Sequence, residues 1–134
     1  MEKTKANFRA VRDTLGLSQQ DVADIADVAV LTVKRWEKPG NSWMPPDDVW
    51  EWLIHLLDVQ HATVGIALDA ADGHDAVQLT YYRSQEQYDA LGRDDGPVGM
   101  ANANTRLTAS LLMLAGRSVS FSYPDDADNV YHGH

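Results

Sequence analysis

Positively charged side chains gather in one short stretch, Lys34, Arg35 and Lys38, directly before Pro39-Gly40. Lysine and arginine donate hydrogen bonds to phosphate oxygens, and both also bind the acceptor edge of guanine in the major groove. The residues that precede them, Val28 to Val33, are mostly apolar. The stretch therefore carries donors that a DNA-reading surface needs, next to side chains that offer none.

The overall charge argues against strong binding to nucleic acid without sequence preference. The chain has 20 Asp/Glu against 11 Lys/Arg, a formal net charge of −9. Residues 1–60 hold seven Lys/Arg against ten Asp/Glu, and residues 61–134 hold four against ten. Because DNA affinity comes largely from phosphate neutralisation, binding here requires a local basic face.

Patterns typical of catalysis or metal binding are missing from the sequence. The chain has no cysteine, no glycine-rich phosphate loop, no nucleophile elbow and no H-E-x-x-H motif. His132 and His134 lie near several aspartates, but in a terminal tail, which does not hold ligands in a fixed geometry. We therefore expect a protein that is not an enzyme and has no metal or other cofactor.

Membrane and export signals are missing as well. No apolar run approaches the roughly 18 residues needed to span a membrane. The first residues, MEKTKANFRA, lack the apolar core of a signal peptide. The sequence therefore predicts a cytoplasmic protein with no membrane partner.

Three short helices are expected to position the basic stretch. Phe8 to Leu15 carries an apolar stripe with helical spacing, and Gly16 is a residue type that ends helices. Ser18, with an aspartate three residues later, predicts the start of a second helix. A third helix is expected from about Ala29 to Glu37, before the Pro-Gly pair. Two short helices joined by a tight turn form a helix-turn-helix arrangement.

The same region resembles the Cro/C1 (XRE) family of phage and bacterial repressors. The resemblance covers roughly residues 8–57 and rests on Leu15-Gly16-Leu17-Ser18-Gln19, Val22-Ala23, Val33 and Trp36-Glu37, with Pro45-Pro46 as in small prophage and plasmid regulators. In that family the third helix lies in the major groove, and the start of the second helix holds a phosphate. The DNA contacts that the resemblance implies are Gln19 on the backbone, Val30, Leu31 and Arg35 on bases, and Thr32 and Lys34 beside them. Lys38 is expected to contact DNA as well, because of its positive charge.

The helical repeat separates the two faces of the third helix. At about 100° per residue, Val33 and Trp36 share an inner face, whereas Leu31 and Arg35 point away from it. A single exposed leucine is common, and it can also contact a thymine methyl group. We further expect Lys3 and Lys5 to form a flexible arm over the DNA backbone. The alternative is a helical bundle with no DNA function, whose lysines are simply solvated.

A longer helix is expected from Pro46 to Val59. It is apolar on two sides, and one of these stripes consists of Trp50, Ile54 and Leu57. Helices that are apolar all round are buried between layers. We therefore expect this stripe to contact either the second half of the chain or a second subunit.

The second half predicts a β-β-α-α-β unit. Strands are expected over residues 62–68 and 76–83 as a hairpin, and over 117–123, with helices starting at Ser84 and at Asn102 or Asn104. The predicted fold class is thus α+β, an all-α helix-turn-helix bundle followed by this small unit. The predicted domains are a DNA-binding domain at 1–60, a dimerisation, partner or effector unit at 61–123, and a mobile acidic tail at 124–134.

Two functions follow as hypotheses. The first is a sequence-specific regulator of double-stranded DNA, a homodimer that represses a small prophage or mobile-element operon. The second is a protein-interaction module or antitoxin, in which the helix-turn-helix serves mainly as scaffold for a protein partner. The charge of −9 and the outward-facing Leu31 motivate the second.

Overall fold

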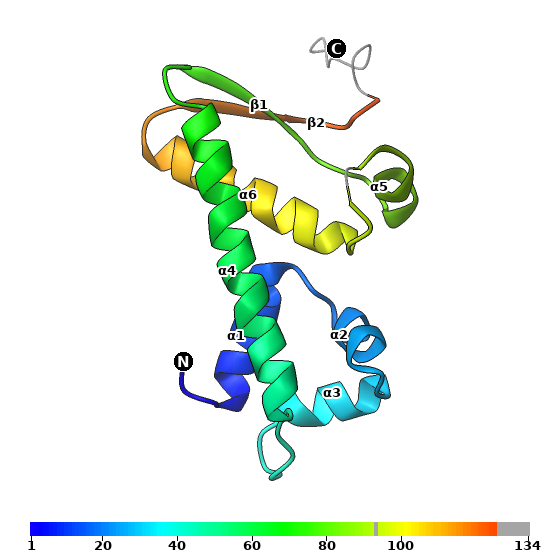
Figure 1. Cartoon of the computed structure of the whole chain (residues 1–134). Coiled ribbons are helices and arrows are strands. Elements are labelled where there is room, and N and C mark those ends of the chain that lie inside the picture. Colours follow the sequence, from blue (N-terminus) through cyan, green and yellow to red (C-terminus); the bar gives the residue numbers. More distant parts are fainter. Residues whose placement is uncertain (93, 126–134) are drawn as a thin grey trace. The chain divides into compact units, whose positions relative to one another are not determined.

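The chain mixes helices with a small two-stranded sheet, and it divides into two compact units, Met1–Ala62 and Thr63–His134. Figure 1 shows the computed structural model, which describes residues 1–92 and 94–125. The division falls inside one continuous helix, and not at a change from helix to strand. Most of the predicted acidic tail, residues 126–134 with His132 and His134, lies outside the described residues.

The N-terminal unit is helical, as predicted. It consists of α1 (Lys5–Leu15), α2 (Gln19–Ala26), α3 (Val30–Glu37) and the first part of α4 (Asp47–Ala70) (Figure 1). Gly16 ends α1 in the left-handed conformation, with φ of 73°, which glycine adopts without steric cost. The predicted capping pair of Ser18 and Asp21 begins α2. Local sequence signals therefore set these helix ends.

The core of the N-terminal unit is built around an aromatic cluster. The ring of Phe8 meets Trp36 of α3 and Trp50 of α4 edge to face, with centroid distances of 5.9 and 5.6 Å. Such edge-to-face pairs stabilise by roughly 0.5–1.5 kcal/mol beyond the area that they bury. The side-chain amide of the buried Gln60 donates to the carbonyl of Thr14 at 2.9 Å, which ties α4 to the end of α1. These contacts hold both α3 and α4 against α1.

The C-terminal unit contains the rest of α4, then β1 (Ala76–Thr80), α5 (Gln85–Leu91), α6 (Val98–Leu114) and β2 (Ser118–Ser122). The two strands pair in parallel, with Ala76 opposite Ser118 and Thr80 opposite Ser122. Parallel strands need a long crossover, which α5 and α6 supply. Ser84 caps α5 as predicted, through a hydrogen bond from the backbone N–H of Gln87.

The predicted strand over residues 62–68 is wrong, because these residues continue α4. No hairpin is therefore formed, and the described order after the helix is β-α-α-β. The β-branched residues within 62–68 favour a strand, but no residue of a type that ends helices separates them from the preceding helix. The buried residues Gln60, Val64 and Ala71 recur at helical spacing. Gly65 costs only about 1 kcal/mol in a helix interior, too little to end a helix held by packing.

The start of α6 also differs from the prediction. It begins at Val98, after Pro97, and not at Asn102 or Asn104. The buried amide of Asn102 instead exchanges two hydrogen bonds with the backbone of Tyr82, at 2.9 and 3.0 Å. Asn102, whose type suggests a helix cap, thus satisfies backbone hydrogen-bonding groups beyond the end of β1 instead. No helix in the described part of the chain is long and apolar enough to cross a membrane.

Candidate nucleic-acid interface

One exposed stripe of α3 collects its basic side chains. Leu31, Lys34 and Arg35 are exposed on the helix, and Lys38 follows at its C-terminal end. Their spacing of three, four and seven residues places them on one face. Val33 and Trp36 are buried on the opposite side, with 0% and 3% exposure. Packing therefore turns the predicted base-reading face outward.

The only acidic residue of α3 is turned away from this stripe. Glu37 accepts two hydrogen bonds of 2.7 Å from Arg12 of α1, a bidentate pair in which the two side chains are 10% and 5% exposed. Arg12 also donates to the carbonyl of Leu17 at 2.9 Å. The hydrogen bond that Arg12 donates to Glu37 raises the pKa of Arg12 above its ordinary value. The exposed stripe of α3 consequently carries positive charges only.

A lysine holds the C-terminal end of α3. Lys5 Nζ lies within 2.5–3.3 Å of the carbonyl oxygens of Arg35, Trp36 and Trp43 and of the side-chain oxygen of Asn41. The last carbonyls of a helix have no partner within it and carry partial negative charge, so they attract an ammonium group. The expected flexible arm is therefore not formed by Lys5. Lys3 pairs with Asp47 at 2.6 Å and lowers the pKa of that carboxyl.

The loop after α3 brings Trp43, which was not predicted from the sequence, to the candidate interface. The guanidinium of Arg35 lies over the ring of Trp43, 5.5 Å from its centroid. Trp43 is 55% exposed, and its neighbour Met44 is 38% exposed. A tryptophan inside a loop of Gly, Asn, Ser and Pro is unusual enough to have indicated a contact. Stacking limits the freedom of the arginine that the resemblance assigns to base reading.

The remaining predicted contact residues are less exposed. Val30 and Thr32 are half-buried at the start of α3. Gln19, in the first turn of α2, is also half-buried, and its amide donates to Glu37 at 3.4 Å. One amide hydrogen of Gln19 is thus directed to the Arg12–Glu37 pair, which leaves the other for a further acceptor.

The predicted stripe of α4, Trp50, Ile54 and Leu57, does not form a single exposed surface. Trp50 is 3% exposed and lies in the core of the N-terminal unit against Phe8. Ile54 and Leu57 are half-buried. The structure therefore assigns Trp50 to the stability of this unit, and an outside contact is expected only of the other two.

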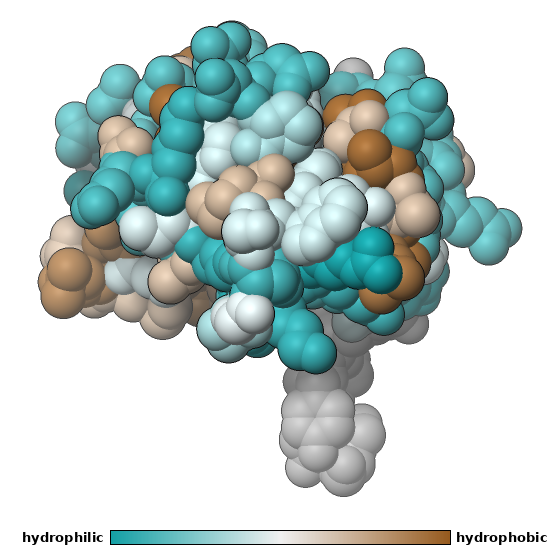
Figure 2. Space-filling view, turned by 90° about the horizontal axis from the view of Figure 1, so that it is seen from below, coloured by the Kyte–Doolittle hydropathy of each residue, from teal (hydrophilic) through white to brown (hydrophobic). Residues whose placement is uncertain are grey.

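Exposed apolar side chains accompany the basic ones. Ile25 of α2 is 49% exposed and Leu31 is 53% exposed, in addition to Trp43 and Met44. Figure 2 shows hydrophobic residues in separate groups among hydrophilic ones, on the face seen from below. The N-terminal unit thus offers both charged donors and apolar contact area.

No protein-family model matches the chain, and no curated protein matches it. Among residues 1–92 and 94–125, no group of histidines and carboxylates is placed to hold a metal ion. The function must therefore be argued from the geometry described above.

Proposed function

We propose that the chain is a sequence-specific DNA-binding regulator of the Cro/C1 (XRE) type, with α3 in the major groove. The observation that carries the proposal is the exposed stripe of α3, whose charged residues are all basic, in a chain of net charge −9. Arg35 would read a base edge, and Lys34 and Lys38 would neutralise phosphates. Leu31 would contact thymine methyl groups.

The way in which α3 is held supports this proposal. Val33 is buried at its middle, Trp36 and the Arg12–Glu37 pair anchor its last turn, and Lys5 binds its terminal carbonyls. A recognition helix must keep its register against the bases, so rigid support favours sequence selectivity. Without its pairing to Arg12, the negative charge of Glu37 would repel the DNA phosphates.

We further propose that the regulator acts as a homodimer. Two copies would place two α3 helices about one DNA turn apart, roughly 34–36 Å, on a near-palindromic site. An acidic monomer with three basic residues on its reading face neutralises few phosphates and so gains little affinity from charge alone. A homodimer adds the contacts of a second half-site.

The first experiment measures fluorescence anisotropy with DNA from upstream of the protein's own gene and with a scrambled duplex, at low and physiological salt. The wild-type protein is expected to prefer its own DNA by roughly a thousandfold or more. Arg35→Ala should weaken binding to that DNA by about 1–3 kcal/mol and relax the choice of sequence. Lys38→Ala should weaken binding to both duplexes alike and lower the salt slope by about one.

Arg83→Ala is the matched control, since it also removes one positive charge but lies in the C-terminal unit. It should leave both affinities close to wild type. An Arg35→Ala variant that loses equally on both duplexes would make Arg35 a phosphate contact. No binding at low salt would contradict the proposal itself.

The second candidate function is a protein-interaction module or antitoxin. The exposed apolar residues of the N-terminal unit favour it, namely Ile25, Leu31, Trp43 and Met44. Leu31→Asp should then abolish capture of one stoichiometric, basic partner protein, whereas Arg35→Ala should not. If the first proposal is right, Arg35→Ala is the variant that loses its ligand, and no stoichiometric protein is captured.

A further inference from the structure

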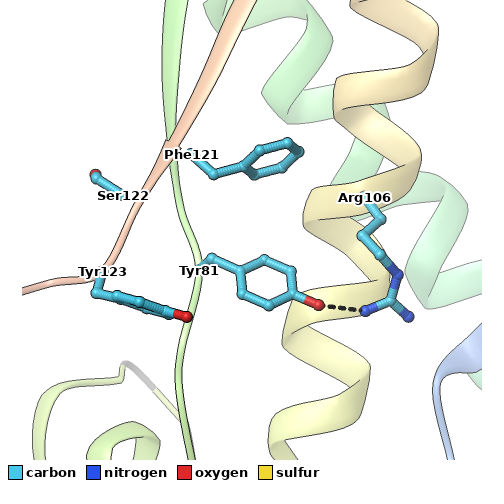
Figure 3. Close-up of a pocket in the computed structure, with 5 residues that line it drawn as sticks. All are labelled: Tyr81, Arg106, Phe121, Ser122 and Tyr123. Carbon is cyan, nitrogen blue, oxygen red and sulfur yellow. Dashed lines mark hydrogen bonds between the residues drawn. The ribbon is translucent and has the colours of Figure 1, made fainter. Parts of the chain in front are cut away.

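The C-terminal unit contains a cavity of about 450 Å³, lined by Tyr81, Arg106, Phe121, Ser122 and Tyr123. Figure 3 shows the rings of Tyr81 and Phe121 pointing from the strands toward Arg106 of α6, while Ser122 points to the other side. Sites for small ligands range from about 300 to 1,000 Å³ and are mostly apolar with a few polar groups. The cavity has this size and this composition.

The cavity follows from the two faces of the parallel sheet. Side chains alternate along a strand, so Val77, Leu79, Val119 and Phe121 share one face. The other face carries Gln78, Thr80, Ser118 and Ser120, which are all exposed. Beyond the last paired residues, the chain continues the apolar face with Tyr81, whose backbone N–H donates to Ser122 at 2.8 Å. Aromatic rings are thereby left at the end of the apolar face.

The aromatic rings are held in place by contacts of their own. Tyr81 and Phe121 pack edge to face, with a centroid distance of 5.9 Å. The guanidinium of Arg83 lies over the ring of Tyr123, 5.4 Å from its centroid, and is itself paired with Asp125 at 2.6 Å. Phe121 nevertheless remains 48% exposed. The wall of the cavity is thus ordered and still offers ring surface to a ligand.

Arg106 gives the cavity a positive charge that no carboxylate among residues 1–92 and 94–125 neutralises. Its Nη1 donates to the hydroxyl oxygen of Tyr81 at 2.8 Å. Among residues 1–92 and 94–125, no carboxylate lies within ion-pair distance of it, whereas Arg9, Arg12, Arg83 and Arg117 each have an acidic partner. An arginine without an acidic partner in the described part of the chain is available for an outside anion. Guanidinium binds carboxylate through two parallel hydrogen bonds.

We infer that this cavity binds a small planar aromatic carboxylate. Arg106 would hold the carboxylate, and the Tyr81 hydroxyl, which accepts from Arg106, would donate its own hydrogen to the same anion. The rings of Phe121 and Tyr81 would pack against the aromatic part of the ligand. The inference is independent of the proposed DNA binding, because each residue that it uses lies in the C-terminal unit.

The test uses 2-naphthoate as probe and the neutral 2-naphthamide as its matched control, with the full chain and titration calorimetry. The acid is expected to bind with a Kd of about 1 mM or tighter. Binding of 2-naphthamide to the wild-type protein, and of 2-naphthoate to Arg106→Met, should each be weaker by roughly tenfold or more, since a hydrogen bond to a charged group is lost. The exposed Arg9→Met variant, which changes the total charge by the same amount, should bind like wild type.

Thermal unfolding of Arg106→Met checks that the variant is folded, and Arg106→Lys should recover part of the affinity. Equal binding of acid and amide would overturn the inference, as would equal losses in Arg106→Met and Arg9→Met. A further measurement follows the Nε–H signal of Arg106 by NMR while the protein is diluted. If this signal moves with protein concentration and not with 2-naphthoate, the cavity is covered by a second copy and the inference is wrong.

Discussion

At the scale of single residues, the buried pair of Arg12 and Glu37 bears on the stability of the N-terminal unit. The guanidinium and carboxylate form two hydrogen bonds of 2.7 Å and are almost fully buried. Burying both ions costs desolvation, so the pair is not an obvious source of net stability. Removing one partner is different, because it strands the other charge in the interior.

Arg12→Met should lower the free energy of unfolding by about 3–5 kcal/mol, since Glu37 is left buried and unpaired. Urea denaturation measures this, and Arg12→Met/Glu37→Met should recover most of the loss. Arg9→Met is the control: its 3.7 Å pair with Asp13 is exposed and should contribute less than about 1 kcal/mol. Equal losses in Arg12→Met and Arg9→Met would contradict a buried pair.

Tyr88 makes a second prediction at this scale. Its hydroxyl donates to Asp94, its ring packs on Tyr82 with a centroid distance of 4.8 Å, and it is 5% exposed. Burial, followed by the contact with Asp94, raises the pKa of Tyr88 above the ordinary value of 10.0. The folded protein thus retains a proton that the unfolded chain loses above that pH. Stability from this group is present below pH 10 and falls as the pH rises further.

Tyr88→Phe should cost about 1 kcal/mol at neutral pH, because a hydrogen bond is lost. Urea unfolding of both proteins from about pH 8 to pH 11 tests the linkage. The difference between wild type and Tyr88→Phe should shrink as the pH rises above about 10. A difference that stays constant over this range would show that the Tyr88 proton is not linked to folding.

At the scale of elements, α2 depends on its first turn. The backbone N–H of Asp21 donates to Ser18 Oγ at 2.9 Å, and the backbone N–H of Ser18 donates to the Asp21 carboxylate at 2.8 Å. These bonds satisfy two donors that an isolated helix leaves open. With only eight residues, α2 gains little from its own helical hydrogen bonds. Its position against α3 therefore rests on the cap and on the burial of Val22 and Ala23.

Ser18→Ala should destabilise the protein by about 1 kcal/mol, because one cap acceptor is removed. Thermal and urea unfolding measure the change. Ser42→Ala, at an exposed loop position, is the matched control and should stay within about 0.5 kcal/mol of wild type. Similar losses in the two variants would argue that the cap adds nothing to stability.

At the scale of the whole molecule, exposed apolar side chains of the C-terminal unit fit the proposed homodimer. Ile66 is 72% exposed and Leu114 is 85% exposed. Single exposed apolar residues need no explanation, but a subunit interface covers such side chains. Self-association would also let an acidic chain bind DNA through two basic stripes at once.

We expect light scattering of the wild-type protein to give the mass of a dimer, and Leu114→Glu to shift it toward the monomer. The charge should be tolerated in the monomer, because the side chain is already in solvent there. Ser120→Glu, at an exposed position on the polar face of the sheet, is the control and should remain dimeric. A wild-type mass of one chain at micromolar concentration would contradict the homodimer.

Local features of the fold were predictable from the sequence. The glycine after α1, the Ser18–Asp21 cap and the Ser84 cap all act within four residues of the helix end that they define. The strand expected over residues 62–68 was wrong because side-chain preference for strands is weak. A growing helix adds one hydrogen bond per residue, and packing of Val64 outweighs that preference.

The candidate site was predictable in part. The helical repeat alone indicated that Leu31 and Arg35 point away from Val33 and Trp36. The helical repeat does not indicate that Lys5 binds the end of α3 or that Arg35 stacks on Trp43. Both contacts join segments that are distant in the sequence, and their formation depends on how the loop after α3 folds back.

The first three helices, the end of α1, the start of α2 and the outward face of α3 could be predicted from local sequence, because helical hydrogen bonds close within a single turn. Three features depend on tertiary packing: β1 and β2 pair in parallel, Arg12 neutralises Glu37, and Arg106 faces an aromatic cavity. Each of these brings together residues whose approach depends on packing of the whole unit. No short sequence pattern encodes such an approach.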